Sequence, residues 1–138
     1  MAAGCTIRME HFERFSSAFA QVAQELLSAD VLTRCLHTDG ALPAEFRQSA
    51  VVEQLNLQVW GQGFEPPTFS EDMEIVSQRL VGEKHLKLQL RHQGEVVDGI
   101  WFGRTDPVPE RVYLAFRLDI NEWRGERKVQ FLIEGAEC

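Results

Sequence analysis

Positive charge is concentrated in one short stretch of this 138-residue chain, Arg-Leu-Val-Gly-Glu-Lys-His-Leu-Lys-Leu-Gln-Leu-Arg at positions 79–91. Its full charges are the cations Arg79, Lys84, Lys87 and Arg91 and the single acid Glu83. The stretch therefore has a local net charge of +3, whereas the formal total of the protein is −7. Cations at this density suit phosphate oxygens, with which they form charge-assisted hydrogen bonds. The stretch is a candidate groove for an anionic polymer.

The same stretch alternates strictly between apolar and polar residues, which predicts a strand. Leucines stand at positions 86, 88 and 90, and His85, Lys87, Gln89 and Arg91 stand between and beside them. Because successive strand side chains face opposite sides, the leucines should point into a core and the polar residues outward. Two interpretations stay open: an edge strand whose lysines prevent edge-to-edge pairing, or one wall of an anion-binding groove.

Two tryptophans could add stacking surfaces to such a groove. Trp101 is expected to project outward between inward-facing Ile100 and Phe102, and Trp123 should lie in a turn beside Arg124. Exposed rings next to cations are typical of single-strand binding, because bases stack on the rings while phosphates pair with the cations. The alternative is that both tryptophans cap the barrel ends or cover the first helix.

No complete catalytic centre is visible in the sequence. A nucleophile elbow, a His-Glu-x-x-His zinc motif and a phosphate loop are all missing. His11-x-Glu13 resembles the start of a zinc deaminase signature, but the required Pro-Cys-x-x-Cys is absent. The oxygen-bearing residues at 119–122 are typical of a strand end followed by a turn. Binding is therefore favoured over catalysis.

Composition predicts a soluble cytoplasmic protein with one ordinary core. The chain is 44% hydrophobic and 25% charged, and no run of residues is apolar enough to span a membrane or serve as a secretory signal. The odd cysteine count (Cys5, Cys35 and Cys138) indicates reduced thiols. An acidic total argues against a strong autonomous nucleic-acid binder. However, ten of the 14 basic residues lie after position 70, so a basic surface would be local.

The elements that would carry these residues fall into a helical first part and a strand-rich second part, an α+β fold. Phenylalanines at 12, 15 and 19 with Val22 and Leu26 predict an amphipathic helix over 10–27. A short strand over 31–38 and a second helix from Pro43 to about Leu57 are expected next. Two glycines and two prolines within 61–67 then mark a domain boundary.

After that boundary the period of the pattern becomes two. It predicts five antiparallel strands, at 72–80, 85–91, 95–102, 111–119 and 128–134. Five short strands in about 70 residues suit the small closed barrel of the oligonucleotide-binding (OB) fold. A five-stranded open sheet is the alternative.

Three motifs in this order resemble the C-terminal part of the RecJ family of bacterial single-strand-specific DNA exonucleases. They are Gly-Gln-Gly at 61–63 ahead of Glu-Pro at 65–66, Arg-Leu-Val-Gly-Glu-Lys-His-Leu-Lys-Leu at 79–88, and Tyr-Leu-Ala-Phe-Arg-Leu-Asp-Ile-Asn-Glu-Trp-Arg-Gly at 113–125. The opening Met-Ala-Ala-Gly resembles the tail of the family's Gly-Gly-His-x-x-Ala-Ala-Gly motif. Trp123 departs from the pattern, in which tyrosine is usual. The resemblance covers essentially the whole chain.

The resemblance implies a fragment of an enzyme that degrades single-stranded DNA from 5′ to 3′ in recombination and repair. Residues 1–30 would be the last helix of the DHH-associated (DHHA1) domain, 31–67 a connector with the second helix, and 68–138 the OB barrel. Mn²⁺ or Mg²⁺ would bind to DHH motifs upstream, so this chain would hold no catalytic residue, metal or cofactor and would be inactive alone.

The resemblance also implies the binding partners of the chain and the residues that would contact DNA. The partners would be single-stranded DNA, the remaining RecJ domains and single-strand-binding protein, with no membrane. The DNA contacts would be Lys84, His85, Lys87, Arg91, Trp101, Arg117, Trp123, Arg124 and Lys128. The competing hypothesis is an interaction domain that docks the other RecJ domains or single-strand-binding protein, with its charges serving solubility.

Overall fold

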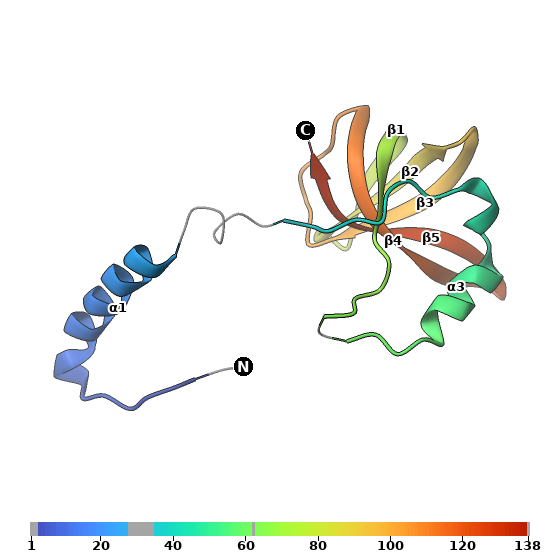
Figure 1. The fold of residues 1–138 in the computed structure, drawn as a ribbon. Helices are drawn as coiled ribbons and strands as arrows, with labels where there is room; N and C mark the ends of the chain where they lie inside the picture. The colour runs from blue at the N-terminus through green and yellow to red at the C-terminus, as the bar shows by residue number, and fades with distance from the viewer. Residues whose placement is uncertain (1–2, 28–34, 62, 138) are drawn as a thin grey trace. The chain divides into compact units, whose positions relative to one another are not determined.

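A computed structural model describes residues 3–27, 35–61 and 63–137, and the chain forms two compact units, Met1–Cys35 and Leu36–Cys138 (Figure 1). The strand expected over 31–38 lies partly outside the described residues, and residues 35–38 are not in a strand. Each unit is described by itself below.

The first unit contains the predicted amphipathic helix. A 3₁₀ turn, Met9–His11, leads directly into α1, Phe12–Leu26. No residue of α1 is buried. Its apolar residues therefore form an exposed stripe, in which the rings of Phe15 and Phe19 stack with centroids 6.1 Å apart. We call this set the phenylalanine stripe; it consists of Phe12, Phe15, Phe19, Val22 and Leu26.

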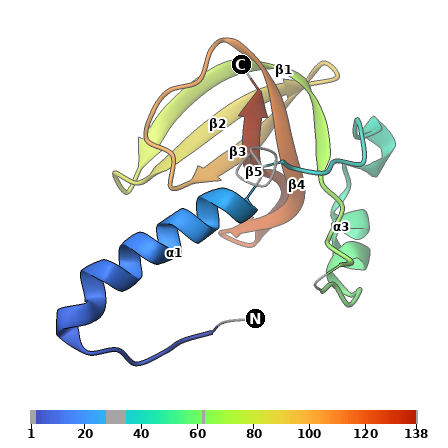
Figure 2. The same ribbon diagram turned by 60° about the vertical axis from the view of Figure 1, so that its left-hand side comes forward.

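The second unit is a closed five-stranded barrel (Figure 2). Its strands are β1 (Phe69–Val81), β2 (His85–His92), β3 (Glu95–Phe102), β4 (Arg111–Trp123) and β5 (Glu126–Glu137). They neighbour one another in the order β1-β2-β3-β5-β4, and β4 closes the barrel by pairing with β1. The closed barrel rather than the open sheet is therefore the architecture.

The expectation of an entirely antiparallel barrel is wrong for one strand pair. β3 and β5 run parallel, with Asp98, Gly99 and Ile100 opposite Gln130, Phe131 and Leu132. The other four neighbouring pairs are antiparallel. Because an odd number of strands cannot alternate in direction all the way around a closed barrel, one pair must be parallel.

The barrel interior is filled by the inward faces of all five strands. Leu86, Leu88 and Leu90 are at most 2% exposed, which confirms the predicted orientation of β2. At the centre the rings of Phe116 and Phe131 stack with centroids 4.3 Å apart. The polar side chains at 85, 87, 89 and 91 consequently face outward, where they can contact a ligand, whereas His92 at the end of β2 is buried.

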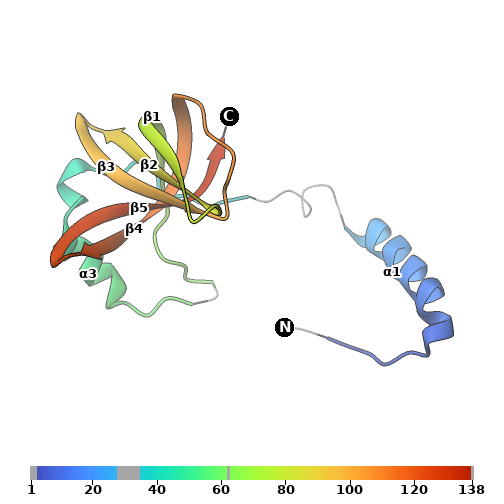
Figure 3. The same cartoon turned by 180° about the vertical axis from the view of Figure 1, so that it is seen from behind.

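The segment before β1 belongs structurally to the barrel. Leu42 is fully buried in the barrel core, and its backbone N–H donates to Glu71 at 3.1 Å. The predicted second helix is two pieces, a 3₁₀ turn Ala44–Phe46 and α3 Ser49–Asn56, because Gln48 has extended backbone angles. α3 lies beside β4 and β5 (Figure 3). The domain limits at residues 30 and 67 stay a prediction, and the burial of Leu42 favours grouping residues 36–67 with the barrel.

Candidate nucleic-acid interface

The outer face of β2 and β3 presents the residues singled out in the sequence. Directly opposite residues of an antiparallel pair share a side of the sheet. His85 is opposite Phe102, Lys87 is opposite Ile100, and Arg91 is opposite Val96. We call this side the β2–β3 face. It carries three of the predicted contacts in one row along β2.

Two further cations border this face at its β1 side. Arg79 of β1 lies opposite Lys87 and shares its side of the barrel. Lys84 is the last of the three residues that connect β1 to β2, after Gly82 and Glu83, whose φ angles of 60° and 58° lie in the left-handed region typical of tight turns. Both cations are exposed, and neither lies within ion-pair distance of an acid in the described part of the chain. Arg79 was not among the site residues predicted from the sequence. Its position in the basic stretch, in the strand next to β2, could have indicated it.

The remaining cations of β2 are partly neutralised by neighbouring acids. The Nζ atom of Lys87 lies 3.9 Å from Oδ2 of Asp98, and Nε of Arg91 lies 3.2 Å from Oε2 of Glu74. Exposed ion pairs of this kind contribute only about 0–1 kcal/mol, so a phosphate can compete with the acid for the cation. The positive charge of the β2–β3 face is therefore weaker than the net charge of the stretch 79–91 suggests.

The predicted orientation of Trp101 is wrong. Trp101 lies opposite inward-facing Leu86 and packs against the barrel core, whereas Ile100 and Phe102 face outward. The inward positions of β3 are occupied by Val97, Gly99 and Trp101. Because glycine has no apolar side chain, the inward set does not stand out as a regular hydrophobic alternation in the sequence. The partly exposed ring of Trp101 instead supports Arg104, whose guanidinium carbon lies 5.0 Å from the ring centroid.

Phe102 is the exposed ring that sequence reasoning missed. Its side chain is 58% exposed and meets the ring of His85 edge-on, with centroids 5.0 Å apart. The backbone N–H of Gly103 donates to Nδ1 of His85 at 3.2 Å, which fixes the imidazole beside Phe102. An aromatic ring and an imidazole thus occupy one end of the β2–β3 face, next to the β1–β2 turn that contains Lys84.

A second group of predicted residues lies at the β4–β5 turn. Trp123 is 68% exposed, and the guanidinium carbon of Arg124 lies 5.7 Å from its ring centroid. Lys128 of β5 is paired with Glu126 at 3.1 Å. OB barrels typically contact oligonucleotides through strands 2 and 3 and through the loops between strands 1 and 2 and strands 4 and 5. The two groups occupy these positions.

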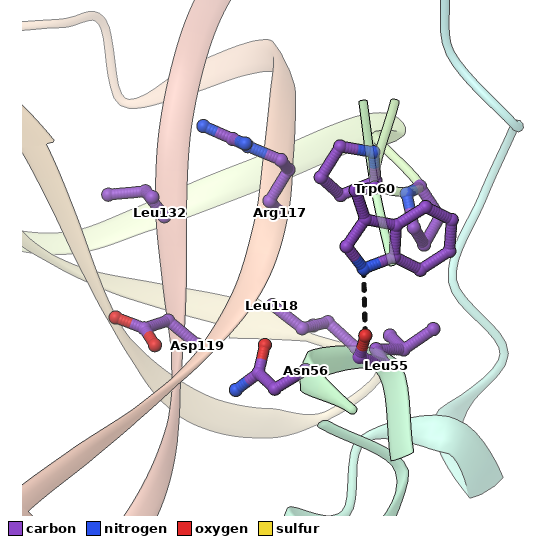
Figure 4. Close-up of a pocket in the computed structure, with 9 residues that line it drawn as sticks. Leu55, Asn56, Trp60, Arg117, Leu118, Asp119 and Leu132 are labelled. Atoms are coloured by element: carbon purple, nitrogen blue, oxygen red, sulfur yellow. Dashed lines mark hydrogen bonds between the residues drawn. The ribbon is translucent and has the colours of Figure 1, made fainter. Parts of the chain in front are cut away.

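Arg117 lies apart from both groups. It faces outward on β4 opposite Leu132, and its Nε donates to Oε1 of Glu134 at 2.8 Å. Figure 4 shows Arg117 in a pocket beside Trp60, whose indole N–H donates to the carbonyl of Leu55 at 2.8 Å. The structure therefore does not bring Arg117 together with the β2–β3 face.

Metal and membrane features are negative in the part of the chain that the structure describes. No group of three or more His, Cys, Asp or Glu side chains in residues 3–27, 35–61 and 63–137 is arranged to hold a metal ion. Over the same ranges, no helix has the length and apolar character needed to cross a bilayer.

Comparison with known proteins identifies the family. The model of the RecJ OB domain matches residues 38–135. The single-stranded-DNA-specific exonucleases RecJ of Dickeya dadantii and Escherichia coli are 38% and 35% identical to this chain over 142 residues, 97% of this chain and 25% of each relative. This chain thus spans about a quarter of the length of these curated relatives.

Solved structures show the same fold. The crystal structures of Thermus thermophilus RecJ in complex with Mg²⁺ and with Mn²⁺ each match 96% of this chain with a TM-score of 0.74 at 20% identity. The match covers 21% and 20% of those chains. With the family model covering most of the sequence and the barrel reproduced in these structures, the chain belongs to the RecJ family and contains its OB domain.

Proposed function

We propose that this chain is the single-stranded-DNA binding and guiding module of a cytoplasmic RecJ-type exonuclease, which degrades DNA from 5′ to 3′ in recombination and repair. One observation carries the proposal: the β2–β3 face of an OB barrel presents His85 and Lys87 together with the exposed ring of Phe102, and Lys84 directly precedes His85 in the chain. This is the surface on which OB barrels bind oligonucleotides.

The proposed contacts divide into phosphate and base partners. Lys84, Lys87 and Arg91 would bind backbone phosphates along β2, and Arg124 and Lys128 would do so near the β4–β5 turn. Phe102 and Trp123 would stack on bases, because both rings are more than half exposed. Trp101 would act indirectly, because its ring supports the guanidinium group of Arg104. Arg117 is the weakest of the proposed contacts, since it lies apart and is paired with Glu134.

The proposal requires only weak binding by this chain alone. The formal charge of −7 opposes a polyanion at long range. In a complete enzyme other domains would hold the same strand and raise its effective concentration at the barrel. Hydrolysis and the Mg²⁺ or Mn²⁺ ions would belong to those domains. We therefore expect no metal-dependent digestion of single strands by this polypeptide.

Fluorescence anisotropy with a labelled oligothymidylate at several salt concentrations tests the proposal. Affinity should fall steeply with salt, because each neutralised phosphate releases counterions. The double variant Lys84→Ala, Lys87→Ala should bind at least about tenfold more weakly and show a shallower salt dependence. Arg111→Ala, which removes an exposed cation from the β1–β4 side, is the matched control and should bind like the wild type.

A protein-interaction domain is the second candidate function. The observations that favour it are the acid partners of Lys87 and Arg91 and the exposed phenylalanine stripe, which offers an apolar surface to another domain or to single-strand-binding protein. Salt-insensitive or undetectable oligothymidylate binding would support this candidate, since only DNA binding predicts counterion release.

A further inference from the structure

A shallow hollow of about 350 Å³ opens on the outside of the barrel where β1, β2 and β3 lie side by side. Two cations and one acid line it, namely Arg79, Lys87 and Asp98. The rest of the lining is Ser77, Gln78, Leu88 and Gln89. Its charged groups come from three different strands, so their spacing is set by the barrel rather than by a loop.

We propose that Arg79 and Lys87 form a phosphate subsite in this hollow, and that Asp98 is a built-in competitor which keeps the subsite weak. The proposal rests on the proposed function, because the phosphate would be one of the backbone phosphates of single-stranded DNA. It goes beyond the predicted contacts by adding Arg79 as a ligand and by giving an acid of the same surface an opposing role.

The geometry of the two cations suits one phosphate. Arg79 and Lys87 are directly opposite on neighbouring strands, a relation that puts their Cβ atoms about 5 Å apart on the same side. Arg79 is exposed and has no acid within ion-pair distance among the described residues. A phosphate between them could accept hydrogen bonds from a guanidinium and an ammonium group at once.

Asp98 is placed to compete for one of these cations. It lies opposite Gln89, one diagonal position from Lys87, and the two charged groups are 3.9 Å apart. That separation is an electrostatic contact rather than a close hydrogen bond. Both side chains are about a third exposed, so the pair is screened by water and a phosphate can displace the carboxylate. The hollow has a net charge of +1 instead of +2.

The competitor has a consequence for a strand that must move. A phosphate that leaves the subsite is replaced by the Asp98 carboxylate, so Lys87 is never without a partner. Release therefore costs less than it would from an isolated pair of cations, and the strand can advance by one nucleotide without breaking a tight contact.

Asp98→Asn tests the proposal, because asparagine keeps the shape of the side chain and removes its charge. Oligothymidylate should bind at least about threefold more tightly to this variant. The slope of log affinity against log salt should steepen by about 0.7, the value for one additional phosphate contact on a single strand. Asp72→Asn is the matched control: Asp72 is also a strand aspartate in an ion pair, with Arg111 at 2.7 Å, and its loss changes the net charge equally. It should leave both quantities close to those of the wild type.

Combining Asp98→Asn with Lys87→Ala tests whether the gain in affinity depends on Lys87. In that background Asp98→Asn should give no more than the effect of the control, because the cation it competes for is gone. Equal gains from Asp98→Asn and Asp72→Asn, or a gain that persists without Lys87, would overturn the subsite while leaving the proposed function intact. Wild-type binding that is absent or independent of salt would instead overturn the proposed function and the subsite with it.

Discussion

At the scale of single residues, the β2–β3 face depends on a few side chains that the barrel has no structural need to expose. Phe102 is the clearest example. An exposed phenylalanine at the end of a strand contributes little to the core, yet its ring is held beside His85 and close to the Lys84 turn. Such a ring is available to bind a ligand, because every nucleobase has a π face that can stack on the phenylalanine ring.

Replacing Phe102 with alanine should weaken oligothymidylate binding by about 1 kcal/mol or more, the lower end of the stacking contribution of one base. The free energy of unfolding should change little, since the ring is 58% exposed. Anisotropy titrations and urea denaturation measure the two quantities. Phe64→Ala is the control, because it removes a 69% exposed ring outside the β2–β3 face. Equal losses of affinity in both variants would contradict a stacking role for Phe102.

At the scale of elements, the segment before β1 is fastened to the barrel by one arginine. Arg47 follows the 3₁₀ turn Ala44–Phe46; it contacts Nδ1 of His92, donates to the carbonyl of His92 at 3.0 Å and pairs with Glu95. His92 is buried at the end of β2, and its Nε2 lies 3.0 Å from the Glu71 carboxylate. Because the Arg47 guanidinium can only donate, Nδ1 accepts from it, and the Nε2–H group donates a hydrogen bond to Glu71.

Arg47→Ala should therefore lower the free energy of unfolding by about 1–3 kcal/mol, the cost of leaving buried polar atoms without their partner. Urea denaturation measures the change. Arg111→Ala is the control, because that arginine is 77% exposed and its ion pair with Asp72 should contribute less than about 1 kcal/mol. A stability of Arg47→Ala indistinguishable from that of the control would show that the segment is held by Leu42 rather than by this network.

Sequence reasoning succeeded for the elements whose pattern is local. The inward leucines of β2 follow from strict alternation, and the helix ending at Leu26 follows from its apolar spacing. It failed where a property depends on distant parts of the chain. The parallel pairing of β3 with β5 is a consequence of barrel closure, which no single strand encodes.

The orientation of Trp101 failed for a different reason. Gly99 occupies an inward position of β3, where an added Cβ would lie 2.9 Å from Cδ1 of Leu90. A glycine required by close packing looks like a break in a hydrophobic pattern, so the alternation was assigned to the wrong set of residues. The predicted DNA contacts likewise came from residue type, whereas the acids beside Lys87 and Arg91 became visible only with strand pairing.

At the scale of the whole molecule, the two units differ in what holds them together. The barrel unit has a continuous core, to which Leu42 and all five strands contribute. The helix α1 buries none of its residues, and its stripe includes Phe19 at 67% and Leu26 at 78% exposure. Burying an apolar stripe of this kind against another surface lowers the free energy. A second copy of the chain always offers such a surface in solution.

Deletion of residues 1–35 should therefore reduce self-association of the chain without lowering the stability of the barrel. The barrel should retain the urea midpoint and the oligothymidylate affinity of the undeleted chain, because every core residue in the described part of the chain lies at or after Leu42. Concentration-dependent self-association, measured by sedimentation velocity, should decrease with the loss of the phenylalanine stripe. The full-length variant Phe12→Ser, Phe19→Ser is the control that changes the stripe without shortening the chain, and it should reduce association in the same direction. A barrel that unfolds at markedly lower urea after the deletion would show that the first unit supports the second.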